Sequence, residues 1–388
     1  MSFLTNLFNF GKKETSDDSV KENSLGEQLE IQSDVQDKNI IDTASEFLGI
    51  KPEEYIYISI GSVSVKILST TKMINNKCKL IWMQEIFLGP FQGKQKGESV
   101  DNIYTTLRSA LEQIREKIDG QKNIFVSLPA EGVFFKNIEV PKIDNKDKLL
   151  EAEIRKAIPI PFEDVLFANN IIWEKDNKEM HFCVIMQREY IEKFEEIFKA
   201  YNVKPYFEIE TFSLSRVISK DNKTRCIVSI GGLHTLMVFT QNGNVVNVNM
   251  LETGSTSINI DMKLKSEITF EQAEELKLNF KNLVQNKMDS AGVIEDFVLD
   301  FSKNISKDIS HTVVSFEGEY DRNVSEIAIC GGGSVVPNLK ENILENFDGN
   351  IVVKRLNSQN IIIADANEMH EENIPRFAQC IGLILMQI

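Results

Sequence analysis

Two glycine-containing turns carry the residues best suited to chemistry in this sequence. The first, in YIYISIGSVSVK, follows an apolar, β-branched run, and the second, in RCIVSIGGLHT, follows a similar run. Glycine allows backbone N–H groups to approach a phosphate, and nearby hydroxyl groups add donors. The pattern predicts two phosphate-binding loops. Their candidate residues are Gly61, Ser62, Val63, Ser64, Lys66, Gly231, Gly232 and Thr235.

A third glycine cluster, AICGGGSVVPNL, follows a predicted strand and is predicted to open a helix. Gly331, Gly332 and Gly333 would then lie at a helix N-terminus, which suits anions or ribose oxygens. A single glycine turn after a strand is usually only a turn. It is the three clusters together that indicate a nucleotide site.

The elements around these turns alternate between strands and helices. Apolar alternation predicts strands, and apolar residues at helical spacing predict helices. Strands and hairpins are predicted within 55–68, 79–88, 123–128, 133–140, 166–173, 204–210 and 225–251, and helices within 99–119, 146–158 and 189–201. The pair Asn242 and Gly243 predicts a hairpin turn, and Pro159 ends a helix. This order indicates a mixed α/β fold.

Length and charge narrow the class of protein. A chain of 388 residues exceeds what one hydrophobic core usually supports, so two lobes are expected. A formal net charge of −15 argues against sequence-independent binding of nucleic acid, which needs basic patches. The five cysteines form no CxxC pair and the four histidines have no metal-ligand spacing. We therefore expect buried, reduced thiols and no zinc site.

The first 53 residues differ in composition from the rest. Residues 1–13 combine Phe and Leu with two lysines. They predict either a short amphipathic helix that binds a membrane surface or a partner, or a frayed terminus. Residues 14–53 are polar and predict an acidic, flexible linker. No apolar run is long enough to span a bilayer, and the start does not match a secretory signal peptide.

The three glycine clusters together resemble the set found in actin-like nucleotide-binding proteins. Further segments resemble the PilM family of type IV pilus assembly proteins, namely ISIGSVSVKIL, NIFVSLPAEGVFFKNIEVP, LLEAEIRKAIPIPFEDVLFANNIIW, YNVKPYFEIETFSLSRVI, ITFEQAEELK and CGGGSVVPNL. The resemblance covers nearly everything from Tyr55 to Ile388. The related cell-division protein FtsA is the nearest alternative, and the proline pair in AIPIPFEDV favours PilM.

The resemblance implies a two-lobed actin-like (ribonuclease H-like) fold with a nucleotide cleft between the lobes. It places the first lobe at 54–129 with about 355–388, an inserted FtsA/PilM-type small subdomain at 130–207 and the second lobe at 208–354. It also implies a cytoplasmic scaffold at the inner face of the cytoplasmic membrane. Its small subdomain would bind the N-terminal peptide of a PilN-like inner-membrane protein, and pilus motor or platform proteins would be further partners.

The resemblance also assigns roles to the glycine clusters and to one charged pair. The first two loops match the phosphate-contacting turns of the family, with Lys66 as the lysine, and the third loop matches the nucleoside side. Glu274 and Lys277, in AEELK, match an acidic and basic pair that flanks ribose and adenine. The alternative for this pair is an exposed ion pair one helical turn apart.

Ser59 and Ser229 stand where actin-like ATPases carry the aspartates that organise magnesium. A hydroxyl group brings no negative charge to a hard cation, and phosphoryl transfer relies on the metal. Impaired hydrolysis is therefore expected, without a catalytic residue or a resident metal. ATP or ADP could still bind to Lys66 with little dependence on Mg²⁺. The alternatives are an empty cleft that serves as a platform, an active ATPase of the same fold and an FtsA-like, membrane-tethered filament protein.

Overall fold

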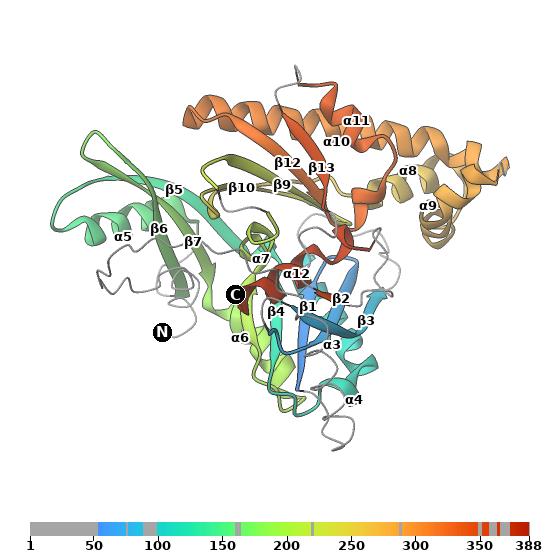
Figure 1. Cartoon of the computed structure of the whole chain (residues 1–388), viewed down its shortest axis with the longest axis horizontal. Coiled ribbons are helices and arrows are strands. Elements are labelled where there is room, and N and C mark those ends of the chain that lie inside the picture. Colours follow the sequence, from blue (N-terminus) through green and yellow to red (C-terminus); the bar gives the residue numbers. More distant parts are fainter. Residues whose placement is uncertain are drawn as a thin grey trace, which may run out of the picture.

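The computed structural model describes residues 53–74, 77–87, 99–159, 164–218, 221–286, 289–347, 351–356, 363–364 and 373–387. Their strands form two large sheets and one small sheet (Figure 1). The N-terminal segment 1–13 and the predicted linker up to residue 52 lie outside the described residues.

The first large sheet has the strand order β14-β3-β2-β1-β4-β8. Three strands form an antiparallel meander, and β4 and β8 extend it in parallel with β1. The strands are β1 (Glu54–Ile60), β2 (Ser64–Thr71), β3 (Cys78–Phe87), β4 (Ile124–Leu128), β8 (Tyr206–Ile209) and β14 (Ile363–Ala364). The β-branched and aromatic residues that predicted β1 and β4 are almost all buried, as expected for central strands covered on both faces.

The second large sheet repeats this plan, with the order β11-β10-β9-β12-β13. Its antiparallel meander is again followed by two parallel strands. The strands are β9 (Thr224–Ile230), β10 (Thr235–Gln241), β11 (Asn244–Leu251), β12 (Val324–Cys330) and β13 (Val352–Arg355). Asn242 and Gly243 join β10 to β11 with φ angles of 53° and 78°, which confirms the predicted hairpin turn. The two lobes predicted from the repeated hairpins are thus built on one topology.

The small sheet has the order β5-β7-β6 and lies beside β11 of the second large sheet (Figure 1). Its elements are β5 (Val133–Pro141), α5 (Lys146–Ala157), β6 (Val165–Lys175) and β7 (Lys178–Gln187). β7, the central strand, was not predicted from the sequence. Six consecutive residues of β7 are buried, and such a run lacks the alternation by which half-buried strands are recognised.

The small subdomain was expected to extend to residue 207, but its sheet ends at Gln187. The next helix, α6 (Arg188–Lys199), packs into the core of the first lobe through side chains that include Phe194 and Phe198. β8 then pairs with β4. Residues 188–209 therefore complete the first large sheet, because apolar side chains spaced three and four apart on α6 bury one face against it.

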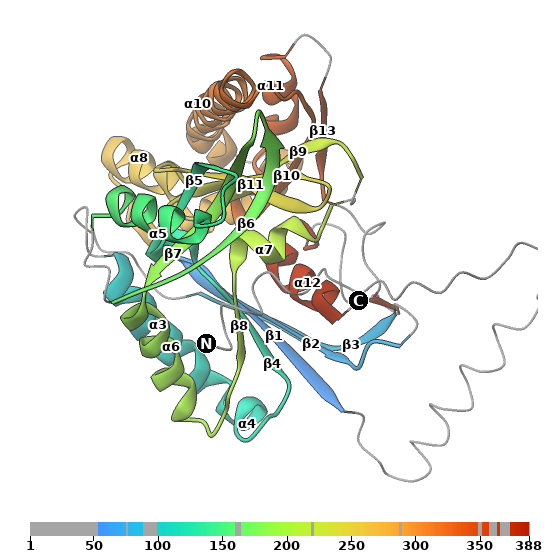
Figure 2. The ribbon, with the colours of Figure 1, turned by 90° about the vertical axis from the view of Figure 1, so that its left-hand side faces the viewer.

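Helices separate and cover the two large sheets (Figure 2). α3 (Ser99–Gln113) packs with α6 on one face of the first sheet, while α7 (Glu210–Ser215) and α12 (Ala378–Ile384) lie between the two large sheets. The outer face of the second sheet is covered by α8 (Thr256–Ser266), α9 (Phe270–Gln285), α10 (Asp289–Tyr320) and α11 (Leu339–Leu344). α12 contacts β1 and β4, so the end of the chain returns to the first large sheet.

Two predicted helices differ from the structure. The helix expected over 99–119 is interrupted at Ile114, after which α4 (Arg115–Ile118) begins. The glycine cluster opens a 3₁₀ turn, η3 (Gly332–Val335), instead of an α-helix, and α11 begins only at Leu339. The reason is Pro337, which lacks an N–H group and holds the preceding Val336 at a ψ of 132°.

Candidate functional site

A cavity of about 290 Å³ lies where the three glycine loops meet between the two lobes. Every predicted site residue except Thr235 contributes to its wall, including Ser59 and Ser229. Thr235 is the first residue of β10, and its neighbours His234 and Leu236 face the cavity. Because side chains alternate along a strand, Thr235 points to the other face, where its buried hydroxyl donates to Thr253 O over 2.7 Å.

The first loop joins β1 to β2. The Gly61 N–H donates to Ser64 O over 3.0 Å, and a Cβ at Gly61 would lie only 3.0 Å from that oxygen, so glycine suits this tight turn. Ser59 and Lys66 face each other across the two strands. The turn therefore places the serine hydroxyl and the lysine at the same end of the cavity.

Lys66 belongs to a buried charged cluster that the sequence analysis did not identify. Its Nζ lies 3.3 Å from Glu85 Oε1 and donates to Ser64 Oγ over 2.9 Å. Ser64 Oγ donates in turn to Glu85 Oε1 over 2.8 Å. The other carboxylate oxygen of Glu85 accepts from Arg376, which lies in η5 (Pro375–Phe377) near the end of the chain. One carboxylate thus holds two cations in the cavity wall.

Ser59 is hydrogen-bonded to a neutral amide. Its Oγ donates to Gln379 Oε1 over 2.9 Å, and Gln379 Nε2 donates to Glu210 Oε2 over 2.8 Å. Glu210 Oε1 also accepts from the Ala130 N–H over 2.8 Å. Burial raises the pKa of the Glu210 carboxyl to about 7, and the nearby Glu131 carboxylate adds to the rise. The chain of contacts connects β1, α12 and α7 around the cavity.

The second loop joins β9 to β10 and touches the first loop. The Gly231 N–H donates to His234 O over 2.9 Å, which repeats the turn of the first loop. A Cβ at Gly232 would lie 2.5 Å from a methyl carbon of Val63, and the Leu233 N–H donates to Ser62 Oγ over 3.2 Å. The two loops therefore close one end of the cavity against each other.

The third loop follows β12. Gly331 has a φ of +88°, a conformation that favours glycine, and a Cβ there would lie 2.4 Å from Ile230 O. Its N–H donates to Pro375 O over 2.8 Å, which fixes the loop to the segment that carries Arg376. Gly332 has nothing within 4 Å of an added Cβ. The glycines bring the second lobe and the C-terminal segment together at the cavity.

Glu274 and Lys277 form the ion pair that their spacing suggested, with Nζ 2.6 Å from Oε2. The pair is not an exposed one, because Lys277 Nζ also donates to the buried Asn259 Oδ1 over 2.8 Å. Burial lowers the pKa of Lys277, and the Glu274 carboxylate opposes this shift. Both side chains line the cavity, as the predicted nucleoside site requires.

A family model of the type IV pilus assembly protein PilM matches residues 58–388, which is more than half of the chain. This chain belongs to the PilM family. Its fold is accordingly the mixed α/β fold of actin-like ATPases, as the sequence resemblance implied. A search of curated proteins found no match.

Solved structures share the fold of this PilM-family chain. A chain of a PilM-PilN type IV pilus biogenesis complex has a TM-score of 0.68 at 16% identity, over 86% of this chain and 98% of that chain. The ethanolamine utilization protein EutJ from Carboxydothermus hydrogenoformans has a TM-score of 0.51 at 12% identity, over 87% and 91%.

Other features of this PilM-family chain bear on membranes, metals and thiols. Among the residues that the structure describes, no helix has the length and apolar character needed to cross a bilayer. In the same part of the chain, no three His, Cys, Asp or Glu side chains form a group that could hold a metal ion. All five cysteines are buried and unpaired, as predicted.

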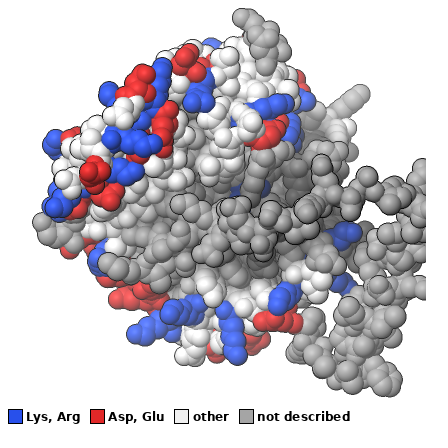
Figure 3. All heavy atoms as spheres, turned by 60° about the vertical axis from the view of Figure 1, so that its left-hand side comes forward, with Lys and Arg blue, Asp and Glu red and all other residues white. Residues whose placement is uncertain are grey.

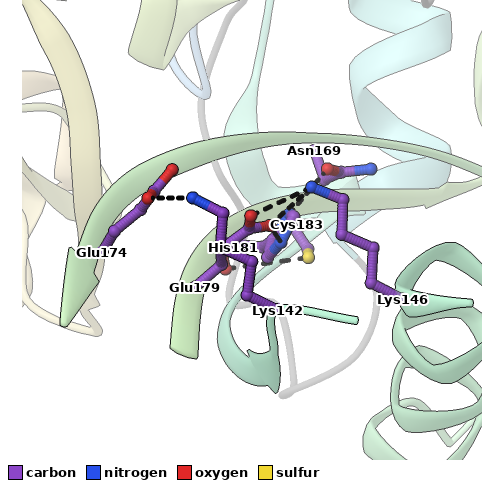
Figure 4. A network of polar contacts seen from close by, with 7 residues as sticks. All are labelled: Lys142, Lys146, Asn169, Glu174, Glu179, His181 and Cys183. Atoms are coloured by element: carbon purple, nitrogen blue, oxygen red, sulfur yellow. Dashed lines mark hydrogen bonds and ion pairs between the residues drawn. The ribbon is translucent and has the colours of Figure 1, made fainter. Parts of the chain in front are cut away.

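The small subdomain carries a second polar network, at the start of α5 (Figure 4). Lys146 Nζ donates to both carboxylate oxygens of Glu179, over 2.8 and 3.0 Å, and His181 Nε2 lies 3.2 Å from Glu179 Oε2. These hydrogen bonds lower the pKa of Glu179, with Lys146 as the largest cause. His181 Nδ1 is 2.9 Å from Asn169 Oδ1. The network attaches α5 to the small sheet.

One face of the molecule shows how its charged side chains are distributed. On the face in Figure 3, acidic and basic side chains are interspersed. Exposed ion pairs on the small subdomain are part of this pattern, such as Lys142 with Glu174 at 2.6 Å and Arg155 with Glu151 at 2.7 Å. Such exposed pairs contribute little to stability.

Proposed function

We propose that this protein is a cytoplasmic scaffold of a type IV pilus, or of a related secretion machine, and that it binds nucleotide with impaired hydrolysis. The observation that carries the proposal is the pair Ser59 and Ser229. Both lie at the ends of the central strands and in the cavity wall, where a carboxylate would be needed to hold magnesium. In this proposal the protein works by binding, and its two lobes transmit the state of the cavity to its partners.

Nucleotide binding is supported by what remains in the cavity wall. The three glycine loops allow close approach of a phosphate, and Lys66 supplies a positive charge at the end where the first two loops meet. Glu274 and Lys277 line the same cavity, where they could contact ribose and adenine. The glycine and lysine positions are thus arranged for a nucleotide, while the serines provide no anionic ligand for a metal.

Thermal unfolding of the full chain with ATP or ADP, each with and without magnesium, tests this proposal. A ligand that binds only the native state raises the unfolding midpoint by mass action. We expect ATP to raise the midpoint whether or not magnesium is present, and Lys66→Ala to lose most of the rise. Lys122→Ala, at an exposed position outside the cavity wall, is the matched control and should keep it. Magnesium-dependent turnover that Lys66→Ala abolishes would instead establish an active ATPase.

We further propose that the small subdomain binds the N-terminal peptide of a PilN-like inner-membrane protein, which would hold the scaffold at the inner face of the membrane. The similarity to a chain of a PilM-PilN complex supports this partner. Fluorescence anisotropy with a labelled peptide that copies the N-terminus of the co-encoded PilN-like protein is the test, with a scrambled peptide as control. Equal anisotropy for the two peptides at high micromolar protein would contradict it. Pilus motor or platform proteins remain proposed further partners.

A further inference from the structure

The cavity contains a second cation, Arg376, at the same place as Lys66. Arg376 reaches the cavity wall from η5, which lies far from Lys66 in the sequence. Both cations bind the Glu85 carboxylate, Lys66 through Oε1 at 3.3 Å and Arg376 through Oε2. Two positive charges therefore face a single negative one, which leaves the three-residue cluster with a net charge of +1.

The cluster is shielded from bulk water. The side chains of Lys66 and Glu85 are 11% and 12% exposed, and that of Arg376 is 25% exposed. Screening by salt and solvent is weak for such partly buried charges, so an anion in the cavity would interact strongly with the excess positive charge. Three other acidic side chains line the cavity: Glu210, which contacts Ser59 through Gln379, and Glu131 and Glu274. The partners of Lys66 and Arg376 in the cluster are Glu85 and Ser64, not these three carboxyl groups.

We propose that Lys66 and Arg376 together bind the terminal phosphate of the nucleotide, and that Glu85 occupies both cations in the empty protein and gives them up to the phosphate. The proposal rests on the nucleotide binding proposed above. Two cations replace the charge that a divalent metal ordinarily supplies, so the recognition needs no metal. A guanidinium group suits this role because its donors match two oxygens of a phosphate or a carboxylate.

The position of Arg376 fits a phosphate contacted from both lobes. Pro375 O, next to Arg376, accepts from the Gly331 N–H of the third loop over 2.8 Å. Glu85, on β3, pairs across the sheet with Lys66 on β2, beside the first loop. The segment that carries Arg376 thus contacts the glycine loop of the second lobe through Pro375 and the first lobe through Glu85.

A purely structural role makes a different prediction for Glu85. If the cluster only attaches η5 to β3, Glu85→Gln weakens the contact between Arg376 and residue 85 and leaves the affinity for nucleotide unchanged or lower. If Glu85 competes with the phosphate, Glu85→Gln raises the affinity for ATP, because the ligand no longer has to displace a carboxylate. The affinity for adenosine, which has no phosphate, should not change.

Isothermal titration calorimetry on the full chain distinguishes these roles, with ATP, ADP and adenosine in buffer containing EDTA or magnesium. We expect Arg376→Gln to lower ATP affinity about tenfold or more and Glu85→Gln to raise it several-fold, because charged hydrogen bonds are each worth about 1.5–3 kcal/mol. Arg376→Lys, which keeps the charge and loses the fork, should lie between Arg376→Gln and the wild type. Adenosine affinity should be equal in all four proteins, and EDTA should not weaken ATP binding to the wild type.

The outcomes separate this inference from the proposed function. If the wild type binds neither ATP nor adenosine, nucleotide binding itself is wrong and the inference falls with it. If the wild type binds ATP but Arg376→Gln binds it equally well, or if EDTA abolishes binding, only the two-cation site is overturned. Should Arg376→Gln fail to fold, the Arg376→Lys and Glu85→Gln proteins decide, since an unchanged ATP affinity in both contradicts the proposal.

Discussion

The β1–β2 hairpin of the first lobe and the β9–β10 hairpin of the second have the same backbone and different chemistry. In each, a glycine N–H closes the turn on a carbonyl three residues later, Gly61 on Ser64 at 3.0 Å and Gly231 on His234 at 2.9 Å. Each central strand also carries a serine two residues before the glycine, Ser59 or Ser229. The hairpins differ in what faces that serine.

In the first lobe Lys66 lies opposite Ser59 and pairs onward with Glu85. In the second lobe the equivalent positions are Leu236, opposite Ser229, and Met250. All of these residues line the cavity. The turn is formed by backbone groups, whereas the charge depends on two side-chain positions in each lobe. Both copies of the duplicated topology can therefore keep the hydrogen-bonded turn while only one copy carries charged side chains.

The largest expected effect concerns the strand that pairs in parallel with each central strand, β4 with β1 and β12 with β9. β12 turns at Gly331 with a φ of +88°, whereas β4 stays extended through Leu128 at the equivalent position. Gly331→Ala should lower the free energy of unfolding by about 3 kcal/mol or more, since its Cβ would meet Ile230 O at 2.4 Å in a strained conformation. Urea unfolding measures this. Gly332→Ala, with open space around it, is the control, and equal losses in the two variants would contradict the prediction.

Next in size is the response of the two serines to a negative charge. Ser229→Asp should lower the free energy of unfolding by about 2–3 kcal/mol, because the carboxylate would be buried opposite Leu236 without a cation. Ser59→Asp should cost less than about 1 kcal/mol, because Lys66 faces it. Chemical denaturation of both variants compares them. Similar costs at the two sites would show that the charge difference between the lobes has no energetic effect.

A smaller effect is expected where the two loops touch. Gly232→Ser gives the second loop the residue that the first has at the equivalent place, Ser62. It should cost about 1–2 kcal/mol, since the added Cβ would lie 2.5 Å from Val63. A double-mutant cycle with Val63→Ala tests the contact, and the double variant should be more stable than the sum of the single effects predicts. Additive changes in the free energy of unfolding would mean that residues 63 and 232 do not interact energetically.

The smallest effect is a pH dependence that arises at Glu210, which contacts Ser59 of the first lobe through Gln379. The Glu210 carboxyl has a pKa of about 7 in the native protein, above its ordinary value near 4.5. Between these values the native state keeps a proton that the unfolded state has released. The free energy of unfolding should therefore fall as pH rises from about 4.5 to 7, by about 1 kcal/mol once solvent in the cavity is considered.

Glu210→Gln is the matched variant for this pH dependence. An amide can still accept from the Ala130 N–H, and the Gln379 side chain can reverse its hydrogen bonds to Glu210 and Ser59. Urea unfolding between pH 5 and 8 should show that the difference in free energy between wild type and variant shrinks as pH rises. A constant difference over this range would contradict the raised pKa.

Much of the fold and of the glycine loops could be predicted because the signals are local. A run of β-branched residues, a glycine and a second run define a hairpin without reference to the rest of the chain. For the same reason Asn242 and Gly243 were recognised as a turn. β7 was missed because a strand buried on both faces gives no alternating pattern, and α11 was predicted too early because Pro337 delays the helix.

The side chains that complete the cavity could not be predicted in this way. Glu85, Glu210, Arg376 and Gln379 lie in ordinary strand and helix sequences with no motif around them. Thr235 is the opposite case, a residue that was predicted to belong to the site and does not line the cavity. Its place in the second loop suggested a phosphate contact, but the alternation of side chains along β10 points its hydroxyl away from the cavity. Of the residues that complete the cavity, Glu85 alone could have been indicated in advance, and only if the register between β2 and β3, which places Glu85 opposite Lys66, had been known.

The sequence by itself determined the family, the repeated hairpins and the serines Ser59 and Ser229 two residues before the loop glycines, because each is a matter of residue type at a local position. The tertiary structure alone decided which charges meet in the cavity. The chain has to return through η5 and α12 before Arg376 and Gln379 can reach β1 and β3. Contacts between residues so distant in sequence are selected by the packing of the two lobes, and no local pattern encodes them.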